Sequence, residues 1–169
     1  MNKIIVIGCP GSGKTTFAKR LAERTGIPLY HLDAVWHKPD KTHIPREEFD
    51  LRLGEILLHD SWIIDGNYQR TMERRIEACD TVILFDLPTE TALEGAISRI
   101  GKMREDMPWA ESELDPGFKK QIEDFDTKNL PLIYSLIEKH GDGREIVIFK
   151  SHEAADGFLR SLTESEMYT

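Results

Sequence analysis

The chain has 169 residues, of which 40% are hydrophobic and 31% charged, and these proportions fit a single domain over residues 1–169 that buries a sizeable core. Thirty acidic residues against 22 lysines and arginines give a formal net charge of −8, which opposes non-specific binding to nucleic acid or to an anionic membrane. The two distant cysteines favour reduced thiols, and without a signal peptide or an apolar run of about 18 residues we expect a cytoplasmic protein.

The first predicted unit is a strand, a loop and a helix. Residues 3–7 form a β-branched apolar run that ends at Gly8. From Lys14 to Thr25 the apolar residues recur at helical spacing until Gly26. The glycine-rich segment between them is therefore the loop that joins a strand to a helix.

The rest of the chain continues to alternate between strands and helices. The predicted elements are a strand at 28–32, a helix at 46–59, a strand at 61–64, a helix near 71–78, a strand at 81–85, a long helix from 89 toward 104, a polar stretch at 105–117, a helix at 118–140, a strand at 145–149 and a closing helix after 151. This order predicts an α/β, three-layer fold with a parallel sheet of about five strands.

Polar residues follow four of these strands. They are Gly8, Asp33, Asp65 and Asp86. Ligands of open parallel sheets bind outside the carboxyl ends of the strands. Carboxylates gathered there repel each other unless cations or hydrogen-bond donors compensate. The pattern indicates a phosphate ligand with a divalent metal.

The loop itself satisfies the G-x-x-x-x-G-K-[ST] pattern of a phosphate-binding loop, with the required strand before it and helix after it. Its backbone N–H groups and the positive end of the helix dipole suit phosphate oxygens. We expect Lys14 to bind the β- and γ-phosphates of ATP and the Thr15 hydroxyl to bind Mg²⁺. The predicted nucleotide-binding residues are Gly8, Pro10, Gly11, Ser12, Gly13, Lys14, Thr15 and Thr16.

The loop alone does not separate kinases from GTPases, motors and ATPases, because all of them bind a nucleoside triphosphate in this way. The sequence contains no Asn-Lys-x-Asp guanine-reading motif, and it is short for an ATPase with its own helical domain. Both observations favour a kinase.

Residues 62–68 look like the Asp-Gly element of adenylate-kinase-like kinases, and the whole chain resembles that group. Over nearly its full length it is also similar to a bacterial family labelled topology modulation or FlaR-like proteins. The segments that carry this resemblance are GCPGSGKTT, Tyr30-His31-Leu32-Asp33 with Trp36, Asp65-Gly66-Asn67-Tyr68, Phe85-Asp86-Leu87-Pro88 and Arg104-Glu105-Asp106-Met107. The resemblance implies a P-loop kinase with a short lid at about residues 100–117.

The same resemblance implies roles for individual residues. Asp65 would bind Mg²⁺ through water, or else cap a turn, and Asp33 would bind the acceptor or act as a base, or else serve as an ordinary turn residue. Arg99 and Arg104 would clamp the transferring phosphate. Asp86 is expected to be mainly structural. The predicted acceptor-binding residues are Asp33, Trp36, Asn67, Tyr68 and Arg75.

Two alternatives stay open at these positions. Trp36 is either a pocket wall or a core residue. Arg75, with Arg70 and Arg74, either recognises an acceptor phosphate or belongs to a solvated helix face. The histidines near Asp33 have mixed spacing and no cysteine partners, which argues against a metal site there.

Together these patterns predict a phosphotransferase that uses ATP and Mg²⁺ and moves the γ-phosphoryl group to a small nucleotide, nucleoside or hydroxyl metabolite. Asn67 and the residues after it replace the proline and arginine of the kinase element, which weakens the case for AMP as the acceptor. The alternative is a nucleotide-binding regulatory protein that influences DNA topology. The sequence carries no signal for an oligomeric state.

Overall fold

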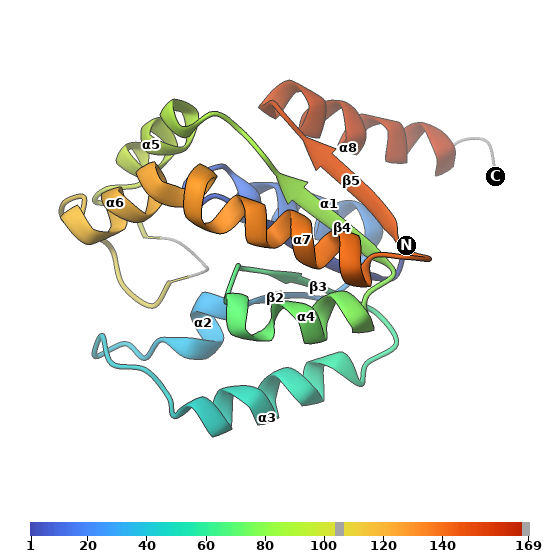
Figure 1. The fold of residues 1–169 in the computed structure, drawn as a ribbon, viewed down its shortest axis with the longest axis horizontal. Helices are drawn as coiled ribbons and strands as arrows, with labels where there is room; N and C mark the ends of the chain where they lie inside the picture. The colour runs from blue at the N-terminus through green and yellow to red at the C-terminus, as the bar shows by residue number, and fades with distance from the viewer. Residues whose placement is uncertain (104–106, 167–169) are drawn as a thin grey trace.

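The structure, a computed structural model, describes residues 1–103 and 107–166 (Figure 1). It contains a five-stranded parallel sheet in the order β2-β3-β1-β4-β5. The strands are β1 (Lys3–Gly8), β2 (Leu29–His31), β3 (Trp62–Asp65), β4 (Thr81–Phe85) and β5 (Glu145–Phe149). The predicted α/β fold with a parallel sheet is confirmed.

Helices cover both faces of the sheet, with two clusters of buried apolar residues between the layers. On one face lie α1 (Lys14–Thr25) and α8 (His152–Glu166). The other face carries α3 (Arg46–Leu57), α4 (Gln69–Ala78), α5 (Thr89–Ser98), α6 (Pro116–Asp124) and α7 (Leu130–His140). Because β3 and β4 are buried at every residue, they read in the sequence as continuous apolar runs.

Aromatic packing fixes α1 on the sheet. The ring of Phe17 on α1 lies edge-on to Phe85, with 5.2 Å between ring centroids, and to Phe149 at 5.3 Å. All three side chains are buried. This contact sets the start of α1, and with it the phosphate loop, against the carboxyl ends of β4 and β5.

Three elements differ from the predicted ones. The short helix α2 (Leu32–Trp36) was not predicted, because five residues are too few to show a helical period. Helix α5 ends at Ser98, and Gly101 follows in a left-handed conformation. The predicted helix at 118–140 is interrupted by a π-helical turn, η1 (Phe125–Asn129), just before Pro131, which lacks the N–H that a regular α-helical turn would use.

The strand order brings separate parts of the chain to one edge of the sheet. Strand β3 lies directly beside β1, so Asp65 pairs in register with Val6 and also with His31 of β2. Gly8, where the phosphate loop begins, ends β1 at the same edge. None of the helices among residues 1–103 and 107–166 is both long and apolar enough to cross a bilayer.

Candidate active site

The phosphate loop between β1 and α1 is held by its own polar groups. The carbonyl oxygen of Cys9 accepts hydrogen bonds from the Ser12 N–H (3.2 Å), the Ser12 hydroxyl (2.5 Å) and the Lys14 ammonium (3.0 Å). Gly13 precedes α1 with φ 92°. These contacts give the loop one compact conformation that leads directly into the N-terminus of α1.

Two neighbouring elements also lie in close contact with the loop. Gly11 has φ 82°, and a Cβ atom there would overlap the carbonyl oxygen of Ala92 on α5. On the opposite side, the Nε2 atom of His152 lies 2.8 Å from the carbonyl oxygen of Ser12. The loop is therefore clamped between α5 and the start of α8, which keeps its backbone preorganised for a ligand.

The Lys14 side chain is half-buried and lines the cavity described below. Burial lowers the pKa of Lys14 to about 8, while the nearby carboxylate of Asp65 acts in the opposite direction. A desolvated ammonium gains more from an anionic partner than an exposed one does. Lys14 is thus suited to pairing with phosphate oxygens.

A cavity of about 980 Å³ opens beside the loop. The predicted site residues that line it are Pro10, Gly11, Lys14, Thr15, Asp33, Asp65, Asn67, Tyr68 and Arg99. The remaining predicted residues that the structure describes do not line this cavity: Gly8, Ser12, Gly13, Thr16, Trp36 and Arg75. Arg104 lies outside the described residues.

Asp65 is buried beside His31, a contact that the sequence does not predict. The Nδ1 atom of His31 lies 2.9 and 3.0 Å from the two carboxylate oxygens of Asp65, and the side chains are 12% and 5% exposed. The Thr15 hydroxyl and the Asp65 carboxylate line the same cavity. Both offer the oxygen ligands that Mg²⁺ prefers, so the donor set fits this metal. Only the parallel pairing of β2 with β3 brings His31 next to Asp65.

The predicted acceptor side of the cavity contains a hydrogen-bonded pair. The Tyr68 hydroxyl donates to a carboxylate oxygen of Asp33 at 2.6 Å. The Tyr68 ring stacks on Phe49 with 5.3 Å between centroids, and Trp36 lies edge-on at 6.4 Å. Trp36 also stacks on His43 at 4.2 Å. Trp36 therefore packs behind Tyr68, which agrees with the core alternative for this residue.

Arg75 is where the structure contradicts a predicted site residue. Its side chain is fully buried and donates hydrogen bonds to the backbone carbonyl groups of Gly66 (2.9 Å), Asn67 and Tyr68 (3.2 Å). Burial lowers the pKa of Arg75 to about 9, and the Asp65 carboxylate opposes this effect. The expectation that Arg75 binds an acceptor phosphate is wrong, because its guanidinium is directed at the chain's own backbone.

Asp86 does not line the cavity. Its carboxylate accepts hydrogen bonds from the Tyr134 hydroxyl (2.6 Å) and from Lys150. These partners connect the end of β4 with α7 and with the residue after β5. The contacts agree with the structural role expected for Asp86.

Residues 107–115 cover part of the cavity, and the sequence reading named none of their contacts. The Trp109 ring lies edge-on to His37, with 5.2 Å between centroids, and the Lys41 ammonium lies 6.0 Å from the Trp109 ring centre. Trp109, His37 and Lys41 all line the cavity. The stretch lies within the expected lid at about residues 100–117, but it shows no hydrophobic period, so the sequence does not indicate what Trp109 contacts.

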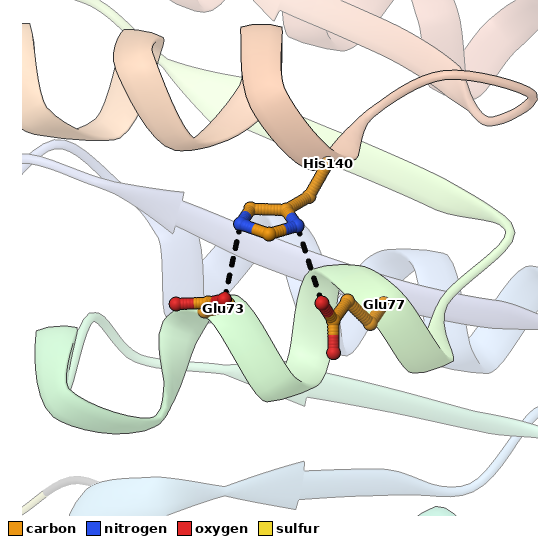
Figure 2. A group of neighbouring side chains, drawn as sticks. All are labelled: Glu73, Glu77 and His140. Carbon is orange, nitrogen blue, oxygen red and sulfur yellow. Dashed lines mark ion pairs between the residues drawn. The ribbon is translucent and has the colours of Figure 1, made fainter.

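A second group of ligand-type side chains lies on α4 and α7 (Figure 2), and none of its members lines the cavity. His140 Nε2 is 3.1 Å from Glu73, and His140 Nδ1 is 3.2 Å from Glu77. The two ring nitrogens point at different carboxylates, and one metal ion cannot bind both nitrogens of one ring. The group is therefore accounted for as an ion-paired link between α4 and α7.

Comparison with known proteins agrees with this arrangement. No family model matches the chain. Two adenylate kinase sequences of Thermotoga neapolitana, one of them from strain ATCC 49049, are each 29% identical to it over 80 residues. These residues make up 47% of this chain and 36% of the adenylate kinase, so the match spans little more than a third of that enzyme.

Two solved kinases share the fold over almost the whole chain. Shikimate kinase from Acinetobacter baumannii, in complex with shikimate, has a TM-score of 0.62 at 17% identity and covers 99% of this chain and 94% of its own. A gluconokinase from Sinorhizobium meliloti 1021 has a TM-score of 0.51 at 15% identity and covers 99% and 96%. The chain therefore has a P-loop kinase fold, while its resemblance to the topology modulation family stays a prediction.

Proposed function

We propose that this protein is a cytoplasmic phosphotransferase that moves the γ-phosphoryl group of ATP to a hydroxyl group of a small molecule. The observation that carries the proposal is that one cavity joins the two halves of the reaction. The phosphate loop with Lys14 lines one part, and the hydrogen-bonded pair of Asp33 and Tyr68 lines another. A nucleotide and an acceptor bound in the same cavity could meet in line.

The nucleotide-binding part of the cavity must position the phosphates and neutralise their charge, and it needs no covalent chemistry. Lys14 binds the β- and γ-phosphates, and Arg99, which also lines the cavity, neutralises the charge of the transferring group. Thr15 and Asp65 would hold Mg²⁺, which would supply positive charge next to the phosphates during transfer.

The acceptor half needs a proton acceptor. The acceptor oxygen forms a bond to the γ-phosphorus, the bond to the bridging β-γ oxygen breaks, and the hydroxyl proton passes to the Asp33 carboxylate. The Tyr68 hydroxyl, which donates to Asp33, keeps this carboxylate in one orientation. Residues 107–115 act as a short lid that limits hydrolysis by water.

The shikimate kinase neighbour supports a hydroxyl acceptor, because the ligand in that structure is shikimate. The acceptors that fit the proposal are a nucleoside, a nucleotide or another hydroxyl metabolite. The adenylate kinase match covers too little of that enzyme to assign its acceptor to this chain.

The test is a screen for acceptor-stimulated release of ADP. Purified protein with ATP and Mg²⁺ is offered nucleosides, nucleotides, polyols and hydroxy acids, and any phosphorylated product is identified by mass. The matched control is Asp33→Asn, which keeps the size of the side chain but removes the base. If ADP binds yet no acceptor stimulates turnover, and salt-sensitive binding to supercoiled DNA is found instead, the regulatory alternative replaces the kinase proposal.

A further inference from the structure

The side-chain amide of Asn67 binds both polar backbone groups of Gly8. Its Nδ2 atom donates to the Gly8 carbonyl oxygen at 2.7 Å, and its Oδ1 atom accepts from the Gly8 N–H at 3.0 Å. Together these two bonds pair both polar groups of Gly8, as a neighbouring parallel strand would. Asn67 lines the cavity, but both ends of its amide are committed to the start of the phosphate loop.

The sheet explains why Gly8 needs this partner. The backbone pairing of β1 with β3 ends at Val6 and Asp65, and the last bond runs from the Gly66 N–H to the Val6 carbonyl. The N–H and C=O of one strand residue point to the same side, and this side alternates along the strand. Gly8 therefore points its polar groups toward β3, where the chain has already left the sheet. The Asn67 amide supplies the missing partner.

Arg75 stabilises the backbone around Asn67 through its own hydrogen bonds. In a continued parallel ladder the Gly66 carbonyl would accept from Gly8, but here it accepts from the buried guanidinium of Arg75. The same guanidinium binds the carbonyl groups of the next two residues. Tyr68, the last of them, adopts φ 37°, an uncommon conformation for a residue with a side chain. Three backbone carbonyls gathered on one buried cation fix the position of Asn67.

A displacement of Gly8 would also move the part of the loop that is proposed to bind the nucleotide. Gly8 is confined on its other side, because a Cβ atom there would collide with the carbonyl oxygen of Phe85. The next carbonyl group, that of Cys9, accepts from Ser12 and from the Lys14 ammonium. A shift of Gly8 therefore moves the anchor of the loop and of its lysine.

We infer that Asn67 is a positioning residue that fixes the phosphate loop for nucleotide binding, with Arg75 as its support, and that Asn67 is not a ligand of the acceptor. The inference rests on the proposed nucleotide site for its effect on affinity. It gives the Asp65-Gly66-Asn67-Tyr68 segment two tasks, because Asn67 supports the nucleotide side while Tyr68 faces Asp33.

The test measures two properties of Asn67→Ala. In the ligand-free protein, hydrogen exchange of the amides in residues 8–14 should become about tenfold faster, because two hydrogen bonds that hold the loop are lost. Affinity for Mg·ADP, measured by calorimetry, should fall about tenfold. The matched control is Asn129→Ala, which removes another cavity-lining amide, one bonded to Gln69 at 3.3 Å. Exchange and affinity in the control should stay at the wild-type values.

Wild-type exchange at residues 8–14 in Asn67→Ala would overturn the inference, as would an equal loss of Mg·ADP affinity in both variants. If Asn67→Ala does not fold, Asn67→Asp keeps the shape and still accepts from the Gly8 N–H, but it cannot donate to the Gly8 carbonyl. Faster exchange is again expected, and unchanged exchange would contradict the inference. Failure of the wild-type protein to bind Mg·ADP would refute the proposed function, and the exchange measurement would still decide the role of Asn67.

Discussion

Replacing Asp65 by asparagine should weaken ADP binding when Mg²⁺ is present but not when it is absent. The side chain is 5% exposed, and an asparagine oxygen in the same place can still accept from His31. The substitution thus removes a charge while it keeps the shape and one hydrogen bond. That charge is the largest influence that opposes the lowering of the pKa of Lys14 and of Arg75.

The magnitude follows from the loss of one charged oxygen ligand. A hydrogen bond to a charged group contributes about 1.5–3 kcal/mol, so affinity for ADP in saturating Mg²⁺ should fall by about 10- to 100-fold. In EDTA the effect of the substitution on ADP affinity should change sign. Without a metal between them, the wild-type carboxylate only repels the phosphates. Asp65→Asn should then bind ADP at least as tightly as the wild type. Stability should fall by about 1–3 kcal/mol, since Lys14 and Arg75 lose a counter-charge.

Calorimetric titration of ADP over a range of Mg²⁺ concentrations, with urea unfolding in parallel, measures both effects. Asp86→Asn is the matched control, because it also neutralises a carboxylate after a strand but one that binds Tyr134 and Lys150 outside the cavity. It should cost about 1 kcal/mol of stability and leave the Mg²⁺ dependence unchanged. An identical Mg²⁺ dependence in Asp65→Asn and wild type would refute the assignment of Asp65 to the metal.

Two further substitutions and one labelling experiment have distinct expected results. Lys14→Ala should fold normally but bind Mg·ADP at least tenfold more weakly, because the phosphates lose a charged partner; unchanged calorimetric affinity would remove the phosphate-loop assignment. Asp33→Asn should abolish acceptor-dependent turnover while ATP affinity is retained, and an equal loss of ATP affinity would move Asp33 to the metal site. Burial raises the pKa of Cys9 and of Cys79 to about 11, which favours the neutral thiol, so only about one molecule in a thousand is a thiolate at pH 8. Both thiols should therefore react with a disulfide reagent far more slowly in the native protein than in urea, with rates that rise toward pH 11, and stoichiometric labelling of the native protein within minutes would contradict this expectation.

Much of the site lies in short segments that the sequence displays directly. The phosphate loop is contiguous, and its glycines, lysine and threonine stand at the spacing that a phosphate-binding loop requires, so the sequence alone predicts the motif. The buried strands likewise appear as apolar runs, because a central parallel strand is covered on both faces. Asp65 was identified because it ends such a run, and its place in the cavity needed only that β3 end at the same edge as β1.

The partners of these residues were decided by the tertiary structure. His31 and Asp65 are 34 positions apart, and they meet only because β2 pairs with β3. Arg75 has the charge of a surface residue, yet it lies on the buried face of α4 with Met72 and Ile76 and binds the backbone of residues 66–68. Strand order and helix orientation follow from the summed packing of many residues that are distant in sequence, and local spacing does not record that sum. The sequence therefore predicts the kind of ligand for the loop, and the packing of β3 and α4 beside β1 decides which side chains hold the loop.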